Sequence, residues 1–138
     1  MTLTLLVNID VDDLARAEAF YRDAFGLTAS RRFGDGGVEM LGASSPVYLL
    51  RKEAGSAASE AVGVKRDYAR HWTPVHLDFV VDDLAAAIAR AEAAGAVREG
   101  EVRTARWGRI ATLADPFGNG FRLIEFLNRG YDEIATGN

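Results

Sequence analysis

His76 and Asp78 lie two positions apart in a segment in which the alternate residues Leu77, Phe79 and Val81 are apolar. This alternation predicts a half-buried β-strand that presents the imidazole and the carboxylate on one solvent-accessible face. An imidazole beside a bound ligand can form hydrogen bonds and act as an acid or a base. His76 could equally be a satisfied polar residue in the wall of the fold, and the sequence leaves both interpretations open.

The segment belongs to an internal repeat. Residues 75–84 read VHLDFVVDDL and residues 6–14 read LVNIDVDDL, so the shift that brings Asp12 onto Asp82 superposes the two copies. In the first copy Asn8 takes the place of Asp78 on the mixed face. A strand that is apolar on one face and polar on the other has a core behind it, and we expect function on the polar side.

Bulk composition narrows the class of protein. The chain has 138 residues, of which 49% are hydrophobic and 26% charged, as in a soluble globular domain. Zero cysteines exclude disulfides and thiolate metal sites and agree with a cytoplasmic location. A net charge of −4 argues against nucleic acid as a partner. The opening residues carry no basic region and no apolar run is long enough to span a membrane, so we expect neither signal peptide nor anchor.

Each copy of the strand is followed by a helical pattern and three further strand patterns. Asp12 is expected to cap the first helix, which ends at Gly26, and Asp82 to cap the second, which ends at Gly95. The pattern predicts an α+β fold with one βαβββ module in residues 1–53 and another in 74–127. Residues 54–73 are expected to be a linker or a lid over a site, and the tail 128–138 a short helix or disordered.

Several short motifs carry a family resemblance. Each helix opens with Asp-Leu, Phe20-Tyr21 is followed by Gly26-Leu27, and residues 115–119 read DPFGN before the final strand. In this order and in two copies, these motifs resemble the vicinal oxygen chelate superfamily, which contains glyoxalases, bleomycin-resistance proteins and extradiol dioxygenases. The resemblance covers about residues 3 to 127. It implies two tandem βαβββ modules that form a cup-shaped mixed sheet with the helices outside.

The resemblance also implies positions for metal ligands inside the cup. Carried over by position, these fall on Leu6, Tyr48, His76 and Arg122, and only His76 keeps the residue type. Glu125 is a tempting substitute, but it lies three places too late, on the face that carries Phe121 and Leu123. A metal, if present, would use His76 first and then Glu125.

The chemistry of these positions argues against a metal. Leu6 has no donor atom and a neutral tyrosine is a poor ligand. At ~4 Å and an effective dielectric constant near 20, two unit charges repel by about 4 kcal/mol, so a dication beside Arg122 would meet roughly twice that repulsion. We therefore expect no metal and no other cofactor. Arg122 either pairs with Asp78 or Asp10, or binds an anionic or carbonyl group of a ligand.

Three aromatic residues complete the candidate site. Tyr48 could pack in the wall or contact the ligand, and Trp107 could stack on a flat ligand at the mouth of the cup or pack at its rim. Trp72, with His71, precedes the central strand and could come from a lid. The predicted ligand-binding residues are Asn8, Tyr48, His76, Asp78, Trp107 and Arg122.

The favoured function is metal-independent binding of a small molecule, in the manner of bleomycin-resistance proteins, for sequestration or carriage. The ligand would be a small molecule that is aromatic or that bears a carbonyl or carboxylate group. The alternative is an enzyme, either a metal-dependent lyase, isomerase or dioxygenase, or a metal-free acid-base catalyst that uses His76. The resemblance implies a homodimer, with or without exchange of modules between chains.

Overall fold

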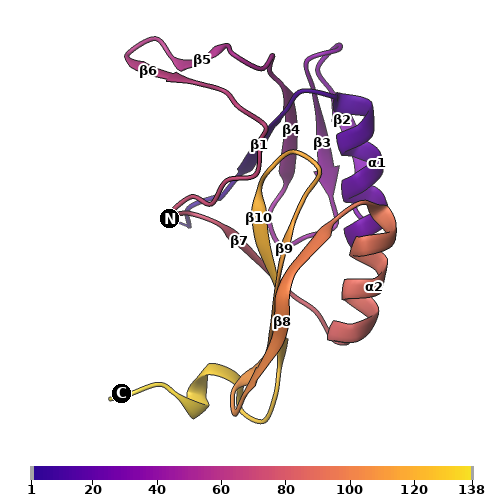
Figure 1. The fold of residues 1–138 in the computed structure, drawn as a ribbon. Coiled ribbons are helices and arrows are strands. Elements are labelled where there is room, and N and C mark those ends of the chain that lie inside the picture. Colours follow the sequence, from indigo (N-terminus) through magenta and orange to yellow (C-terminus); the bar gives the residue numbers. More distant parts are fainter. Residues whose placement is uncertain (1, 138) are drawn as a thin grey trace. The chain divides into compact units, whose positions relative to one another are not determined.

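The computed structural model describes residues 2–137, which form two compact units that meet between Ala69 and Arg70. The first unit contains a complete βαβββ module followed by a hairpin (Figure 1). The elements of the module are β1 (Val7–Val11), α1 (Leu14–Phe25), β2 (Thr28–Arg32), β3 (Gly37–Leu41) and β4 (Val47–Arg51). The strand order is β1-β4-β3-β2. In this sheet β1 is parallel to β4, and the other two pairs are antiparallel.

The second unit repeats this arrangement with the order β7-β10-β9-β8. Its elements are β7 (Leu77–Val80), α2 (Leu84–Ala94), β8 (Val97–Ala105), β9 (Gly108–Ala114) and β10 (Gly120–Phe126). Here β7 is parallel to β10, as β1 is to β4. The predicted α+β fold with two tandem βαβββ modules is therefore confirmed.

Capping explains where the two helices begin and end. The Oδ1 atom of Asp13 accepts a hydrogen bond from the backbone N–H of Arg16 at 3.0 Å, and Asp83 caps α2 in the same way. The predictions of Asp12 and Asp82 as caps were wrong by one residue, because the next aspartate is the one in extended backbone conformation directly before the first turn. Gly26 and Gly95 end the helices with positive φ, as predicted.

Each sheet packs one face against its own helix. In the first module Phe20 of α1 is buried, as are Val38, Met40 and Leu49 of β3 and β4. In the second, Leu84 and Ile88 of α2 are buried, as are three residues of β9 and β10, namely Leu113, Phe121 and Leu123. Side chains alternate across a strand, so the intervening residues of each sheet point away from the helix. We call this second side of each sheet its front face.

The connection between the modules contains more structure than the sequence predicted. Residues Ala57–Ser59 form β5 and Val62–Lys65 form β6, an exposed hairpin that extends away from the sheet of the first unit (Figure 1). Its Ala, Gly and Ser residues show no alternation, which is why the pattern missed it. The assignment of residues 54–73 as linker or lid stays a prediction.

The tail of the second unit forms a 3₁₀ helix, η1 (Gly130–Glu133), so a short helix was the correct alternative for its described part. No helix within residues 2–137 is both long enough and apolar enough to cross a membrane.

Candidate functional site

The front face of the first module carries a buried carboxylate with two partners. Glu39 on β3 lies beside Tyr48 on β4 in the strand register. Arg31 on β2 donates two hydrogen bonds to the Glu39 carboxylate, at 3.0 and 2.7 Å. The Tyr48 hydroxyl donates to the same carboxylate at 2.7 Å and accepts from Arg31 at 3.1 Å. The Glu39 side chain is only 7% exposed, whereas that of Arg31 is 67% exposed.

This network fixes the protonation of its members. The hydrogen bonds from Arg31, and then from Tyr48, lower the pKa of Glu39 to about 2. Its carboxylate in turn raises the pKa of Tyr48. Tyr48 is therefore a neutral phenol, and its O–H group already donates a hydrogen bond to Glu39. It can contact a ligand through its ring or as a hydrogen-bond acceptor.

The front face of the second module carries a second polar row. In the register of β7, β10 and β9, Asp78 lies beside Arg122 and Arg122 beside Thr112. Glu99 on β8 lies beside Thr112 and completes the row. His76 precedes Asp78 by two residues and shares its face, so the structure brings together three of the predicted site residues in this module.

Trp72 lies at the centre of this second group. Its ring centroid is 4.6 Å from that of His76, and the Cζ atom of Arg122 lies 5.3 Å from the ring. The Cζ atom of Arg70 lies 5.6 Å from the same ring. Gly120 makes this position available, because a Cβ atom there would lie 2.3 Å from ring carbon Cε3. Trp72 remains 43% exposed.

The guanidinium group of Arg70 already has hydrogen-bond partners. It donates two hydrogen bonds to Glu99, at 2.6 and 2.7 Å, and a third to the backbone carbonyl of Gly118 at 3.4 Å. The hydrogen bonds from Arg70 lower the pKa of Glu99. The two residues form a closed ion pair at the edge of the group.

His76 and Arg122 each have one buried nitrogen atom without a hydrogen-bond partner among the described residues. The Nε2 atom of His76 lies 3.4 Å from Oδ1 of Asp78, but its Nδ1 atom is buried with no hydrogen-bond partner within residues 2–137. The Nε atom of Arg122 is likewise buried and unpartnered. The described residues also offer Arg122 no ion pair, and Asp10 is held instead by Arg66. Within the second unit Arg122 forms no ion pair with Asp78, and its pairing with Asp10 of the first unit stays a prediction.

Trp107 lies in a different part of the second unit. It belongs to the turn between β8 and β9, and its ring centroid is 5.0 Å from that of Tyr131 and 6.3 Å from that of Phe126. Glu133 of η1 is held nearby by Arg106 and by Arg129. This arrangement packs Trp107 against the tail. A role for Trp107 in stacking on a ligand stays a prediction.

Glu125 caps α2 on the helix side of the second sheet. Its Oε1 atom accepts a hydrogen bond from the backbone N–H of Leu84, the first residue of α2, at 2.9 Å. This places Glu125 on the helix side, opposite Arg122. The structure thus removes Glu125 as a partner for His76.

The donor set does not fit a divalent metal. Of the family's ligand positions, Leu6 offers no donor, Tyr48 is a neutral phenol, Arg122 is a cation, and His76 supplies one imidazole. Within residues 2–137, no three His, Asp or Glu side chains form a group that could hold a metal ion. We therefore derive no chemistry through a metal.

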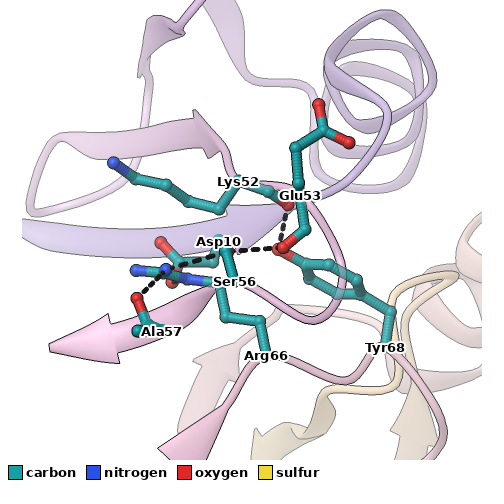
Figure 2. Close-up of polar contacts among 7 residues, drawn as sticks. All are labelled: Asp10, Lys52, Glu53, Ser56, Ala57, Arg66 and Tyr68. Atoms are coloured by element: carbon teal, nitrogen blue, oxygen red, sulfur yellow. Dashed lines mark hydrogen bonds and ion pairs between the residues drawn. The ribbon is translucent and has the colours of Figure 1, made fainter.

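In the first unit, Arg66 ties the β5–β6 hairpin to β1, as Figure 2 shows. Its Nε atom donates to Asp10 at 2.8 Å and its Nη1 atom to the Ala57 carbonyl at 2.6 Å and the Ser56 hydroxyl at 3.2 Å. Tyr68 then donates to the Lys52 carbonyl at 2.7 Å. These bonds hold residues 56–68 of the connection within the first unit.

Sequence reasoning identified the two polar groups only in part. The pairing of Arg31 with Glu39 was missed, although a lone glutamate between Val38 and Met40 in a strand is a signal for a partnered charge. Trp72 was considered for a lid, and no local pattern could reveal its contacts with His76 and Arg122.

Comparison with known sequences agrees with this geometry. The sequence model of a family described as a glyoxalase-like domain matches residues 6–124. The anthracycline biosynthesis protein DauV of Streptomyces sp. (strain C5) is 33% identical over 132 residues, which are 95% of this chain and 44% of that protein. DnrV of Streptomyces peucetius, also described as an anthracycline biosynthesis protein, is 31% identical over 131 residues, with the same coverage. The chain thus spans less than half the length of these relatives.

Solved structures share the fold. A glyoxalase/bleomycin resistance protein/dioxygenase family enzyme from Burkholderia phytofirmans PsJN has a TM-score of 0.71 at 24% identity, over 88% of this chain and 97% of that one. The fosfomycin resistance protein FosX of Listeria monocytogenes has a TM-score of 0.71 at 18% identity, over 92% and 93%. Lactoylglutathione lyase from Agrobacterium tumefaciens has a TM-score of 0.63 at 23% identity, over 91% and 94%. At these identities the likeness concerns the fold alone.

Proposed function

This chain belongs to the glyoxalase-like domain family of the vicinal oxygen chelate superfamily, and on that premise we propose that it binds a small organic molecule without a metal ion. The proposed site is the front face of the second module, around His76, Asp78 and Arg122. Asn8 and Tyr48 on the first module, and Trp107 on the second, are further candidate contacts. Binding serves sequestration or carriage, and no bond of the ligand is broken.

One observation carries this proposal. The family resemblance implies a metal-ligand position at Arg122, and the Nε atom of Arg122 is buried and unpartnered among the described residues. A buried donor without a partner costs about 1–3 kcal/mol. A ligand oxygen that accepts from Arg122 would recover this cost, whereas a dication at the same place would be repelled.

The ligand class follows from the aromatic and polar groups together. Trp72 is 43% exposed and can contact a flat ligand, and Arg122 offers a donor suited to a carbonyl or carboxylate oxygen. The two curated relatives are described by anthracycline biosynthesis, and anthracyclines are planar fused-ring compounds that carry carbonyl oxygens. We therefore propose an aromatic carbonyl compound as the ligand.

A thermal-shift screen of aromatic ketones, quinones and carboxylates tests the site. At about 100 times its Kd, a ligand should stabilise the protein by about 2.7 kcal/mol. The shift should be lost in Arg122→Ala and kept in Arg98→Ala, an exposed arginine of β8 on the other side of the sheet from Glu99. If no compound stabilises the wild type more than Arg122→Ala, the proposed site is wrong.

The metal-dependent alternative is tested separately. His76 keeps the residue type of a family ligand and has Asp78 behind it, an arrangement that metal-binding histidines often use. Elemental analysis of protein purified without added metal would show near-stoichiometric Ni, Zn, Fe or Mn that is lost in His76→Ala if this alternative holds. The metal-free proposal expects no such metal.

We further propose that the protein works as a cytoplasmic homodimer. The absence of cysteine from the sequence supports a reducing compartment, and dimers are the commonest symmetric assembly. Light scattering after size-exclusion chromatography should give twice the mass of the 14.9 kDa chain. A mass of one chain at micromolar concentration would refute the dimer.

A further inference from the structure

The surroundings of His76 differ at its two ring nitrogens. Nε2 faces the carboxylate of Asp78 at 3.4 Å, whereas Nδ1 is buried and has no partner within residues 2–137. A carboxylate accepts hydrogen bonds and does not donate them when ionised. We assign the hydrogen of the neutral imidazole to Nε2, on the side of Asp78, which leaves a lone pair on Nδ1.

Arg122 has the opposite requirement. A guanidinium has only donors, and the unpartnered atom of Arg122 is Nε. Both unsatisfied atoms belong to side chains that contact Trp72. The group therefore lacks two partners of opposite kind, a donor for His76 and an acceptor for Arg122.

The neighbouring charges cannot supply these partners. Arg70 gives its hydrogen bonds to Glu99 and to the backbone of Gly118. Asp78 lies on the Nε2 side of His76 and does not pair with Arg122 among the described residues. Within the second unit the two atoms therefore have no partners, and one bound molecule could supply both.

Resting on the proposed function, we propose that the ligand is a hydroxylated aromatic carbonyl compound. Its hydroxyl group donates to Nδ1 of His76 and its carbonyl oxygen accepts from Nε of Arg122, with the ring beside Trp72. The hydroxyl is the new element, because an aromatic carbonyl alone satisfies Arg122 and leaves Nδ1 without a partner. His76 thus determines specificity and Asp78 positions it by fixing the tautomer.

Three matched quinones test this inference. Equilibrium dialysis measures the binding of 2-hydroxyanthraquinone, unsubstituted anthraquinone and 2-methoxyanthraquinone, at a pH where absorbance shows the free hydroxyl to be protonated. The wild type should bind the hydroxyl compound about tenfold or more tightly than the other two, because a buried acceptor left unpaired costs 1–3 kcal/mol and 1.4 kcal/mol is a factor of about ten. The unsubstituted compound controls for the bulk of the methyl group.

Variants then locate the group that recognises the hydroxyl. In His76→Phe the preference should fall below about twofold while anthraquinone still binds, and in Arg98→Ala it should be unchanged. Equal binding of all three compounds to the wild type would overturn the hydroxyl inference and leave the proposed function standing. A preference that survives in His76→Phe would also overturn it. Failure of all three to bind would count against both this inference and the aromatic carbonyl class.

Discussion

The guanidinium of Arg122 lies beside the indole ring of Trp72, with its Cζ atom 5.3 Å from the ring centroid. The Nε atom of Arg122 is buried without a partner among the described residues. A cation held in this way favours a ligand oxygen over a divalent metal. This relationship supports the proposal of metal-free binding.

Gly120 should control the position of Trp72. A Cβ atom at Gly120 would lie 2.3 Å from the Trp72 ring and 2.7 Å from Nη2 of Arg70. Both are side chains that can move, so Gly120→Ala should displace the ring and change tryptophan fluorescence and ligand affinity. An unchanged fluorescence spectrum in Gly120→Ala would show that the ring does not pack there.

Gly108 provides a contrast. Its Cβ atom would lie 2.8 Å from the backbone carbonyl oxygen of Glu125, which cannot move without disturbing β10. Gly108→Ala should therefore reduce the free energy of unfolding by about 1–3 kcal/mol, as overpacking usually does. Chemical denaturation measures this loss, and a stability equal to that of the wild type would contradict the close approach.

Glu39 should make stability depend on pH in the acid range. Its pKa is about 2 in the folded chain, below the ordinary value of about 4.3 in the unfolded chain. The charged carboxylate therefore stabilises the fold fully above about pH 4.3, and this contribution disappears as the pH falls towards 2. The wild type should exceed Glu39→Gln in stability at pH 7, and the difference should shrink across that window.

Arg31→Gln tests the cause of this dependence. Because the hydrogen bonds from Arg31 are the largest cause of the lowered pKa, its removal should abolish most of the difference between Glu39 and its glutamine variant. Urea denaturation at several pH values measures the free energy of unfolding of the wild type, Glu39→Gln, Arg31→Gln and the double variant. An undiminished pH dependence in the Arg31→Gln background would assign the shift to another group.

Glu125 should affect stability and leave binding unchanged. It accepts a hydrogen bond from the first backbone N–H of α2, and a lost cap costs about 1 kcal/mol. Glu125→Ala should lose about this much, whereas Glu125→Gln should retain most of it through its amide oxygen. Loss of bound metal or of ligand affinity in both variants would return Glu125 to the site.

Arg66 should hold the β5–β6 hairpin in place (Figure 2). It donates to Asp10, Ser56 and Ala57 from a side chain that is only 15% exposed. Lysine cannot make this set of bonds from a planar fork, so both Arg66→Lys and Arg66→Ala should increase amide hydrogen exchange at Gly55 and Arg66's own position. Exchange as slow as in the wild type would mean that the backbone alone holds the hairpin.

Much of the fold could be predicted because the sequence contains it twice. Alternation around Leu77 and Phe79, the glycines that end both helices, and the DPFGN turn are local signals, and local signals identify elements well. The hairpin of β5 and β6 was not predicted, because its strands are short, exposed and rich in small residues. The N-caps were displaced by one position because two aspartates stand side by side and only backbone geometry distinguishes them.

The candidate site was less accessible from sequence. The alternation placed His76 and Asp78 on one face, the family resemblance added Arg122, and the structure brings the three together. The partners of Glu39 and the contacts of Trp72 depend on strand register and on loop conformation, which no local pattern encodes. Trp107 was chosen by its place before Gly108, yet its ring packs against Phe126 and Tyr131 in the tail.

The most direct test of metal-free binding is the affinity of the protein for 2-hydroxyanthraquinone after exhaustive dialysis against a chelator, compared with the same sample after addition of Ni, Zn, Fe or Mn. Binding through Arg122 and His76 predicts the same Kd, within about twofold, in every sample, because a dication beside the guanidinium would be repelled. Binding that disappears on chelation and returns with one equivalent of metal would contradict the account.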